Sequence, residues 1–202
     1  MPIRFTPRMK QRLTRRTLAM LQRSLMYFPE LRGTTITVGY TRKHLGSATV
    51  IYRKGVLSSL IIRLRVRNVT YQTIGHELTH LIQGMAYGET SCRSSAELEK
   101  IPSGEKQCDI WTLARNSLFC DDPPTYIRIP RIMREHWLDY AQSVRALCIS
   151  AIGKRPVHRQ YIRWLENEIA KLSGMQRQEE IAGRQLLLPF LSGRRCAPDD
   201  KG

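Results

Sequence analysis

The chain has 202 residues, of which 42% are hydrophobic and 25% charged, and this length and composition fit one ordinary domain with a buried core. No apolar run approaches the roughly 20 residues of a membrane-spanning helix, and the start of the chain lacks the apolar stretch of a secretory signal. Five scattered cysteines without a CxxC pair argue against a disulfide framework or a zinc ribbon. We therefore expect a cytoplasmic protein with mostly reduced thiols and no membrane span.

Positive charge is concentrated in the first part of the chain. Residues 1–75 hold fifteen of the 33 Lys and Arg residues but only one of the 17 acids, Glu30, while the rest of the chain is nearly balanced. Such an excess is either a solvated basic face or a surface for a polyanion, such as nucleic acid, an acidic membrane surface or an acidic substrate. A cleaved organellar presequence is disfavoured because the basic residues continue through the strands predicted next.

The first elements follow from two kinds of periodicity. Between Pro7 and Phe28 apolar residues recur at helical spacing, which predicts one amphipathic helix with a basic face. Three segments of strand character follow at residues 35–40, 48–54 and 58–67, separated by glycine turns. The sequence therefore predicts a small three-stranded sheet.

The third of these strands alternates apolar and basic side chains. This alternation predicts one packed face and one face carrying a comb of arginines: Arg63, Arg65 and Arg67. The comb either contacts substrate or nucleic acid or protects a sheet edge from aggregation.

From residue 70 the apolar spacing becomes helical again and carries the sequence His76-Glu77-Leu78-Thr79-His80. Positions four apart lie one above the other on a helix, so both imidazoles of an HExxH sequence can reach one metal ion. Glu77 then points at the open metal position. Two surface histidines on an ordinary helix are the alternative interpretation.

A third ligand must come from elsewhere, because hydrolytic zinc sites usually have three protein ligands and one water. Residues Glu105 to Asp109 form an ExxxD pattern on a second predicted helix, with both carboxylates on one face. Three glutamates in the intervening loop compete for the role: Glu89, Glu97 and Glu99. An exposed acidic helix face is the ordinary explanation of ExxxD when it stands alone.

Together the HExxH and ExxxD segments resemble the gluzincins, thermolysin-like zinc peptidases, and their layout is similar to that of the small archaeal minigluzincins. The resemblance covers roughly residues 58–118. It implies that His76, His80 and Glu105 hold one Zn²⁺ and that Glu77 is the general base. It also implies that Asp109 accepts a hydrogen bond from His76, which fits the need of a ligating histidine for a fixed tautomer. No histidine follows in the nearby downstream loop, unlike the metzincin and SprT-like patterns.

The resemblance further implies an α+β fold with a zincin-like core. That core would contain an N-terminal helix, the small sheet, the HExxH helix and the ExxxD helix. The strand before the HExxH helix would occupy the edge position at which an extended substrate adds as a further strand. A developing oxyanion needs another donor, for which Tyr126 and His136 are candidates, although a core tyrosine and a surface histidine are the ordinary alternatives.

Beyond the Pro-rich segment at residues 121–130 the spacing predicts two more amphipathic helices. We divide the chain into a catalytic domain (1–125), a helical extension (126–173) and a tail (174–202). The tail contains an apolar island at residues 186–191, which either packs back on the domain or binds a partner.

These features predict a zinc-dependent endopeptidase that acts on protein or peptide substrates, with one Zn²⁺ per chain. The basic N-terminal half adds non-specific nucleic acid as a partner, by analogy with the role of SprT-like proteases on nucleic-acid-bound proteins. Two alternatives remain open at this point: a nucleic-acid-binding protein with a structural zinc site, and a partner-binding protein with a degenerate peptidase fold.

Overall fold

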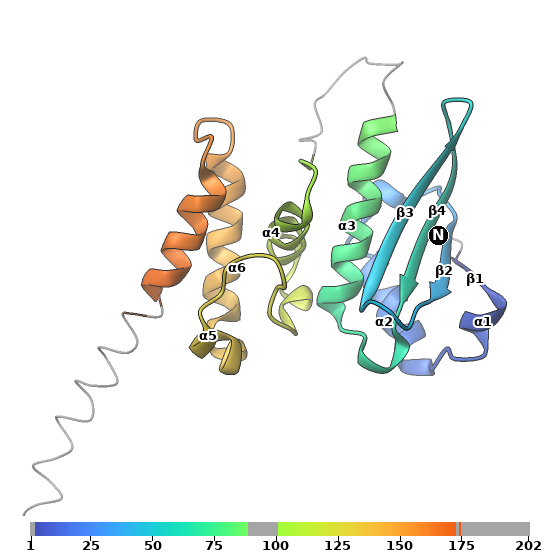
Figure 1. The fold of residues 1–202 in the computed structure, drawn as a ribbon, viewed down its shortest axis with the longest axis horizontal. Helices are drawn as coiled ribbons and strands as arrows, with labels where there is room; N and C mark the ends of the chain where they lie inside the picture. Colours follow the sequence, from blue (N-terminus) through green and yellow to red (C-terminus); the bar gives the residue numbers. More distant parts are fainter. Residues whose placement is uncertain (1–2, 89–100, 173, 175–202) are drawn as a thin grey trace, which may run out of the picture.

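The computed structural model describes residues 3–88, 101–172 and 174. The fold is α+β, with a mixed sheet at one end and a group of helices at the other (Figure 1). The four strands are β1 (Ile3–Phe5), β2 (Ile36–Tyr40), β3 (Gly46–Arg53) and β4 (Val56–Leu64). Their order is β1-β2-β4-β3, in which β1, β2 and β4 are parallel and β3 is antiparallel to β4.

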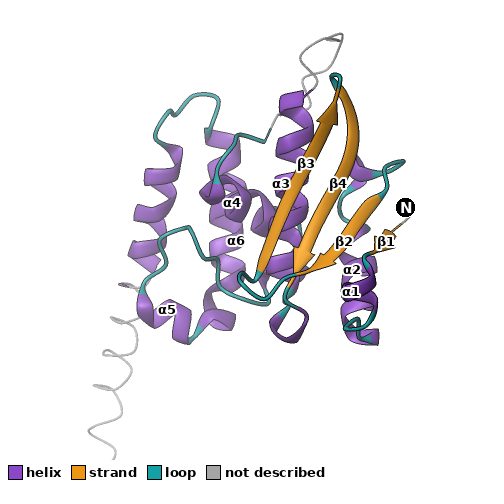
Figure 2. Cartoon of the chain, turned by 45° about the vertical axis from the view of Figure 1, so that its right-hand side comes forward, coloured by secondary structure: helices purple, strands orange, loops and turns teal. Residues whose placement is uncertain are grey.

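The observed sheet differs from the predicted one in two respects. It has a fourth strand, β1, whose three residues are too few to give a periodic signal. In addition, β4 is an internal strand, and β3 is the edge strand on its side of the sheet (Figure 2). The prediction that residues 60–67 form the edge strand is therefore wrong. Sequence order does not reveal that β2 pairs with β4, the second strand of the following hairpin, and leaves β3 on the outside.

The predicted comb of arginines is also only partly present. Leu60, Ile62 and Leu64 are buried against the helices, as the alternation predicts, and Arg63 is exposed between them. The strand ends at Leu64, so Arg65 and Arg67 lie beyond it, in the segment that leads into the short 3-10 helix η2 (Val66–Asn68). The three arginines therefore do not share one strand face.

The single N-terminal helix predicted from the apolar spacing is two helices, α1 (Pro7–Lys10) and α2 (Arg15–Leu25). Thr14 separates them, because its backbone is extended and its side-chain oxygen accepts a hydrogen bond from the Thr17 amide at 3.1 Å. A threonine with this conformation is a favourable N-cap, which starts a new helix at the next residue.

The helices that carry the two motifs follow the sheet. They are α3 (Tyr71–Gly88), which contains HExxH, and α4 (Glu105–Arg115), which contains ExxxD. A carboxylate from elsewhere in the chain caps α3: Asp121 accepts hydrogen bonds from the amides of Tyr71 and Gln72 at 2.8 and 2.9 Å. The remaining elements are η1 (Pro29–Leu31), η3 (Ser117–Cys120), α5 (Arg131–Glu135), α6 (Trp137–Lys154) and a helix at residues 161–172.

Two hydrophobic clusters divide the described residues. In the first, one face of the sheet packs with α2 and α3. In the second, Ile110 and Leu113 of α4 pack with α6 and the helix at 161–172. Helix α4 thus shares its core with the C-terminal helices rather than with the sheet, and the two motifs meet where the clusters adjoin. The domain boundary at residue 125 stays a prediction.

Several predictions fall outside the described residues: the competing ligands Glu89, Glu97 and Glu99, the apolar island at 186–191, and Cys92 and Cys196. The three described cysteines, Cys108, Cys120 and Cys148, are buried free thiols. Over the described parts of the chain, each helix falls short of the length or the apolar content that crossing a bilayer requires.

Candidate metal centre

One face of α3 carries a row of polar side chains that point toward α4. Gln72, His76, His80 and Gln83 are spaced by four, four and three residues, which places them on the same side of the helix. Gln72, His76 and Gln83 are 4–7% exposed. Buried polar groups need hydrogen-bond partners, and each of these side chains finds one on or near α4.

The imidazole of His76 is fixed by Asp109. Its Nδ1 lies 2.9 Å from Asp109 Oδ1, and because a carboxylate only accepts, Nδ1 carries the proton. Gln72 Nε2 donates to the same oxygen at 3.1 Å, and the amides of Tyr126 and Ile127 donate to Oδ2. Asp109 is fully buried and accepts four hydrogen bonds, so it orients His76 and also anchors the loop at residues 126–127.

The imidazole of His80 is fixed by Gln83, a residue that the sequence reasoning missed. His80 Nδ1 lies 3.0 Å from Gln83 Oε1, which also accepts from the Cys108 thiol at 3.1 Å. Gln83 Nε2 donates to the carbonyl oxygens of Pro102 and Gly104, so the orientation of the amide is consistent throughout. The sequence spacing could have indicated this contact, because a residue three positions after His80 lies on the same face of the helix.

The other ring nitrogens of both histidines meet one carboxylate oxygen. The Nε2 atoms of His76 and His80 each lie 3.0 Å from Oε2 of Glu105. Since Nδ1 carries the proton in each neutral ring, two Nε2 lone pairs and a carboxylate oxygen converge on one point. Three acceptors in such proximity are stable only with a cation among them, either a proton or a metal ion.

The pKa shifts of His76 and Glu105 in the metal-free protein also indicate that a cation is favoured between these groups. Burial opposes protonation of His76, but the hydrogen bond and the charge of Asp109, helped by Glu77 and Glu105, raise its pKa above the ordinary value. Burial likewise opposes ionisation of Glu105, but hydrogen bonds from His76 and His80 lower its pKa. The cluster therefore favours positive charge between the histidines and Glu105.

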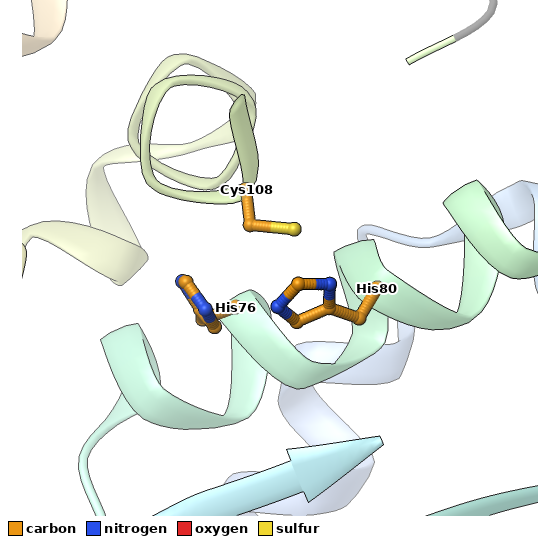
Figure 3. A group of neighbouring side chains, drawn as sticks. All are labelled: His76, His80 and Cys108. Carbon is orange, nitrogen blue, oxygen red and sulfur yellow. The ribbon is translucent and has the colours of Figure 1, made fainter. Parts of the chain in front are cut away.

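Cys108 is a further candidate ligand. Its side chain projects from α4 toward the two imidazoles (Figure 3), and its sulfur lies within 4.8 Å of a nitrogen of each histidine in a group able to hold a metal ion. The buried His76 and Cys108 and the half-buried His80 could thus hold a metal ion. Burial, assisted by the charge of Glu105, raises the pKa of the Cys108 thiol well above its ordinary value, whereas a ligating cysteine must lose its proton.

Glu105 fits the same centre more closely. Neighbouring ligand atoms of a tetrahedral zinc site with nitrogen and oxygen donors lie roughly 3.3 Å apart, given metal–ligand distances of about 2.0–2.1 Å. The 3.0 Å separations between Glu105 Oε2 and the two Nε2 atoms are close to that value. Both Glu105 and Cys108 can therefore be tested as the third ligand.

No protein-family model matches this chain, and no match was found among curated proteins or solved structures.

Glu77 lies between the histidines in sequence and is 7% exposed. Burial raises its pKa to about 7, with a lowering by the charge of His76 and a further rise from Glu105. Gly46 of β3 leaves room for this carboxylate because it has no side chain. A Cβ atom added at residue 46 would lie 2.4 Å from Glu77 Oε1. A side chain at residue 46 would displace Glu77.

A cleft of about 820 Å³ connects these residues with the sheet. His76, Glu77, His80 and Glu105 line one side of it, and residues 44–48, Val50 and Tyr52 line the other. The edge strand β3 thus borders the metal centre. Helix α3 approaches β3 closely at Gly84, where a Cβ would lie 2.4 Å from a methyl carbon of Val50.

The two candidate oxyanion donors have different locations. Tyr126 lines the cleft, is 46% exposed, and stacks on the His76 ring with centroids 5.4 Å apart. Burial and the charges of Glu105 and other nearby acids raise the pKa of Tyr126, so its hydroxyl keeps its proton. His136 lies at the junction of α5 and α6 and does not line the cleft, and a role for it as an oxyanion donor stays a prediction.

Asp109→Asn should weaken metal binding by about 10 to 100-fold, because the acceptor that orients His76 becomes weaker. It should also lower the free energy of unfolding by about 1–3 kcal/mol. The reason is that an NH2 group replaces one carboxylate oxygen and cannot accept the hydrogen bonds of the Tyr126 and Ile127 amides. Chelator competition and urea unfolding measure the two effects. Asp121→Asn is the matched control: this carboxylate also accepts two backbone amides but contacts no histidine, so its loss should reduce stability more than metal affinity. Equal losses of metal affinity would contradict the role of Asp109.

Glu77→Gln should stabilise the metal-free protein at high pH. A carboxyl group with a raised pKa contributes stability that is present below its unfolded value of 4.5 and is lost as the pH rises through about 7. Relative to Glu77→Gln, the wild type should therefore lose about 3 kcal/mol of unfolding free energy between pH 4 and pH 8. Urea unfolding of both proteins in excess chelator measures this difference. A difference that does not change with pH would show that Glu77 ionises normally.

Proposed function

We propose that this protein is a zinc-dependent endopeptidase of the gluzincin type, with a zincin-like core formed by the sheet, α3 and α4. One observation carries the proposal: the Nε2 atoms of His76 and His80 and Oε2 of Glu105 converge at 3.0 Å beside a buried Glu77. An exposed acidic helix face would not explain this convergence. Nor would two unrelated surface histidines, since each ring is held in one tautomer by a separate partner.

His76, His80 and Glu105 would hold the metal, because zinc suits a set of two imidazoles and one carboxylate. When bound, zinc supplies a Lewis acid that polarises a carbonyl group and acidifies water. Glu77 then acts as the general base: its carboxylate takes a proton from a water in the cleft as the oxygen of that water bonds to the peptide carbon. The same proton passes from Glu77 to the leaving nitrogen as the C–N bond breaks.

The edge strand β3 is the surface that would hold the substrate. An extended peptide can pair with the free edge of a sheet, which supplies affinity through backbone hydrogen bonds and demands little of the peptide sequence. Because β3 borders the cleft opposite α3, a peptide paired with it would lie between the strand and the metal centre. Tyr126 would donate a hydrogen bond from its hydroxyl to the oxygen that becomes negative in the tetrahedral intermediate.

A structural zinc site in a nucleic-acid-binding protein is the second candidate. The position of Cys108 favours it, because ligation by this thiolate together with His76, His80 and Glu105 would give a closed four-ligand site. Such a site would leave no position for water and would give Glu77 no proton to accept.

Digestion of casein tests the proposal. The protein loaded with one equivalent of zinc should cleave casein internally, chelator-treated protein should not, and added zinc should restore cleavage. Stoichiometric zinc without cleavage of casein or of a mixed peptide library would favour the structural site instead.

A further inference from the structure

A second hollow, of about 380 Å³, lies at the carboxyl ends of the parallel strands and shares no lining residue with the metal cleft. Tyr40, the last residue of β2, and the segment after β4 form one side of it. Its other residues come from the α1–α2 connection and the first turn of α2. In open sheets with parallel strands, this edge is where ligands commonly bind.

Three arginines converge in this hollow without a carboxylate: Arg12, Arg16 and Arg67. Throughout residues 3–88 and 101–172, none of the three forms an ion pair with an acid. Glu30, the one acid among residues 1–75, is paired with Arg115 at 2.8 Å. The charge of Asp121 reaches Arg16, but both oxygens of that carboxylate accept backbone amides of α3.

Tyr40 extends the same positive surface. The guanidinium groups of Arg12 and Arg8 lie 5.0 and 5.5 Å from the centre of its ring, and Arg42 hydrogen-bonds its side chain. The hydrogen bond from Arg42, with the charges of Arg12 and Arg8, lowers the pKa of the Tyr40 hydroxyl against the opposing effect of desolvation. Five arginines thus surround one ring and one hollow, and their mutual repulsion would be relieved by a bound polyanion.

We propose that this hollow binds backbone phosphates and is the place where the protein holds a nucleic acid. The planar guanidinium group of arginine donates two parallel hydrogen bonds to a phosphate, so converging arginines suit this anion. A nucleic acid also offers a regular row of phosphates, which matches arginines that continue from the hollow, past the Tyr40 ring, to Arg8 and Arg42. A membrane surface fits less well, because none of the exposed large hydrophobic side chains in the described parts of the chain lines the hollow.

The experiment measures the binding of a short labelled DNA duplex by fluorescence anisotropy over a series of salt concentrations. Counterion release makes the logarithm of affinity fall with the logarithm of salt by about 0.9 per phosphate contact. Replacing Arg12, Arg16 and Arg67 by Gln should therefore reduce the size of that slope by about 2–3.

The matched control removes the same charge from the amino ends of the parallel strands, by replacing Arg32, Arg53 and Lys54 with Gln. Arg32 precedes β2, Arg53 ends β3, and Lys54 lies in the turn before β4. This control should change the slope by less than about one. Zinc content should be unchanged in both variants, which separates this test from that of the peptidase proposal. If the triple variant fails to fold, each single replacement should lower the slope by about one.

Several results would overturn the proposal. These are the absence of wild-type binding to the duplex at low salt, and equal slopes in the two triple variants. Binding of inorganic phosphate without binding of the duplex would show a small-anion site, and tighter binding to phosphatidylserine vesicles than to the duplex would show a membrane surface.

Discussion

Glu77→Gln should abolish casein cleavage, with a fall in rate of about 10²–10⁴-fold, while the protein keeps one zinc per chain. The amide occupies the same space beside Gly46 but cannot take a proton from water. The histidines and Glu105 are unchanged, so metal binding should persist. Parallel measurements of zinc content and of the initial rate of cleavage show whether the two properties separate.

The control for this prediction is Glu135→Gln. Glu135 is an exposed carboxylate on α5 that pairs with Arg131 at 2.7 Å and does not line the cleft, so its replacement should leave both zinc and activity unchanged. Cleavage of casein by Glu77→Gln at the wild-type rate would exclude Glu77 as the base.

Glu105→Ala should weaken zinc binding by more than about 100-fold, a larger effect than that of a residue acting only on the orientation of a ligand. The reason is the loss of the one oxygen that lies 3.0 Å from both imidazole nitrogens. Casein cleavage should fall with the metal. Chelator competition gives the affinity, and saturation with excess zinc shows how much activity the occupied site retains.

Cys108→Ser is the companion variant, because it replaces the other candidate third ligand on the same helix. Its hydroxyl can still donate to Gln83 Oε1, so we expect zinc affinity within a few-fold of the wild type. The reverse result, with zinc retained by Glu105→Ala and lost from Cys108→Ser, would replace the gluzincin ligand set by two histidines and a cysteine.

Local sequence patterns were sufficient for the parts of the site that one helix contains. The HExxH spacing placed His76 and His80 on one face of α3, and the ExxxD spacing placed Glu105 and Asp109 on one face of α4. Helix α3 begins at Tyr71, one residue after the point where the helical spacing starts. These predictions succeeded because the geometry of a single helix follows from its residue spacing alone.

Contacts between elements could not be predicted in this way. The sequence did not show that Gln83 would fix His80, that Asp109 would also anchor the loop at 126–127, or that Cys108 would face the two histidines of the candidate metal centre. Each of these depends on how α3 and α4 pack, and α4 is positioned by a hydrophobic cluster that it shares with helices more distant in the chain.

The sequence by itself determined which side chains share a helix face and that the basic charge belongs to residues 1–75. Only the tertiary structure decided that β3 is the edge strand beside the cleft, and that Arg67 converges with Arg12 and Arg16 instead of sharing one strand face with Arg63. The physical reason is that strand order and helix packing are set by burial of apolar faces between segments distant in sequence, which no local period records.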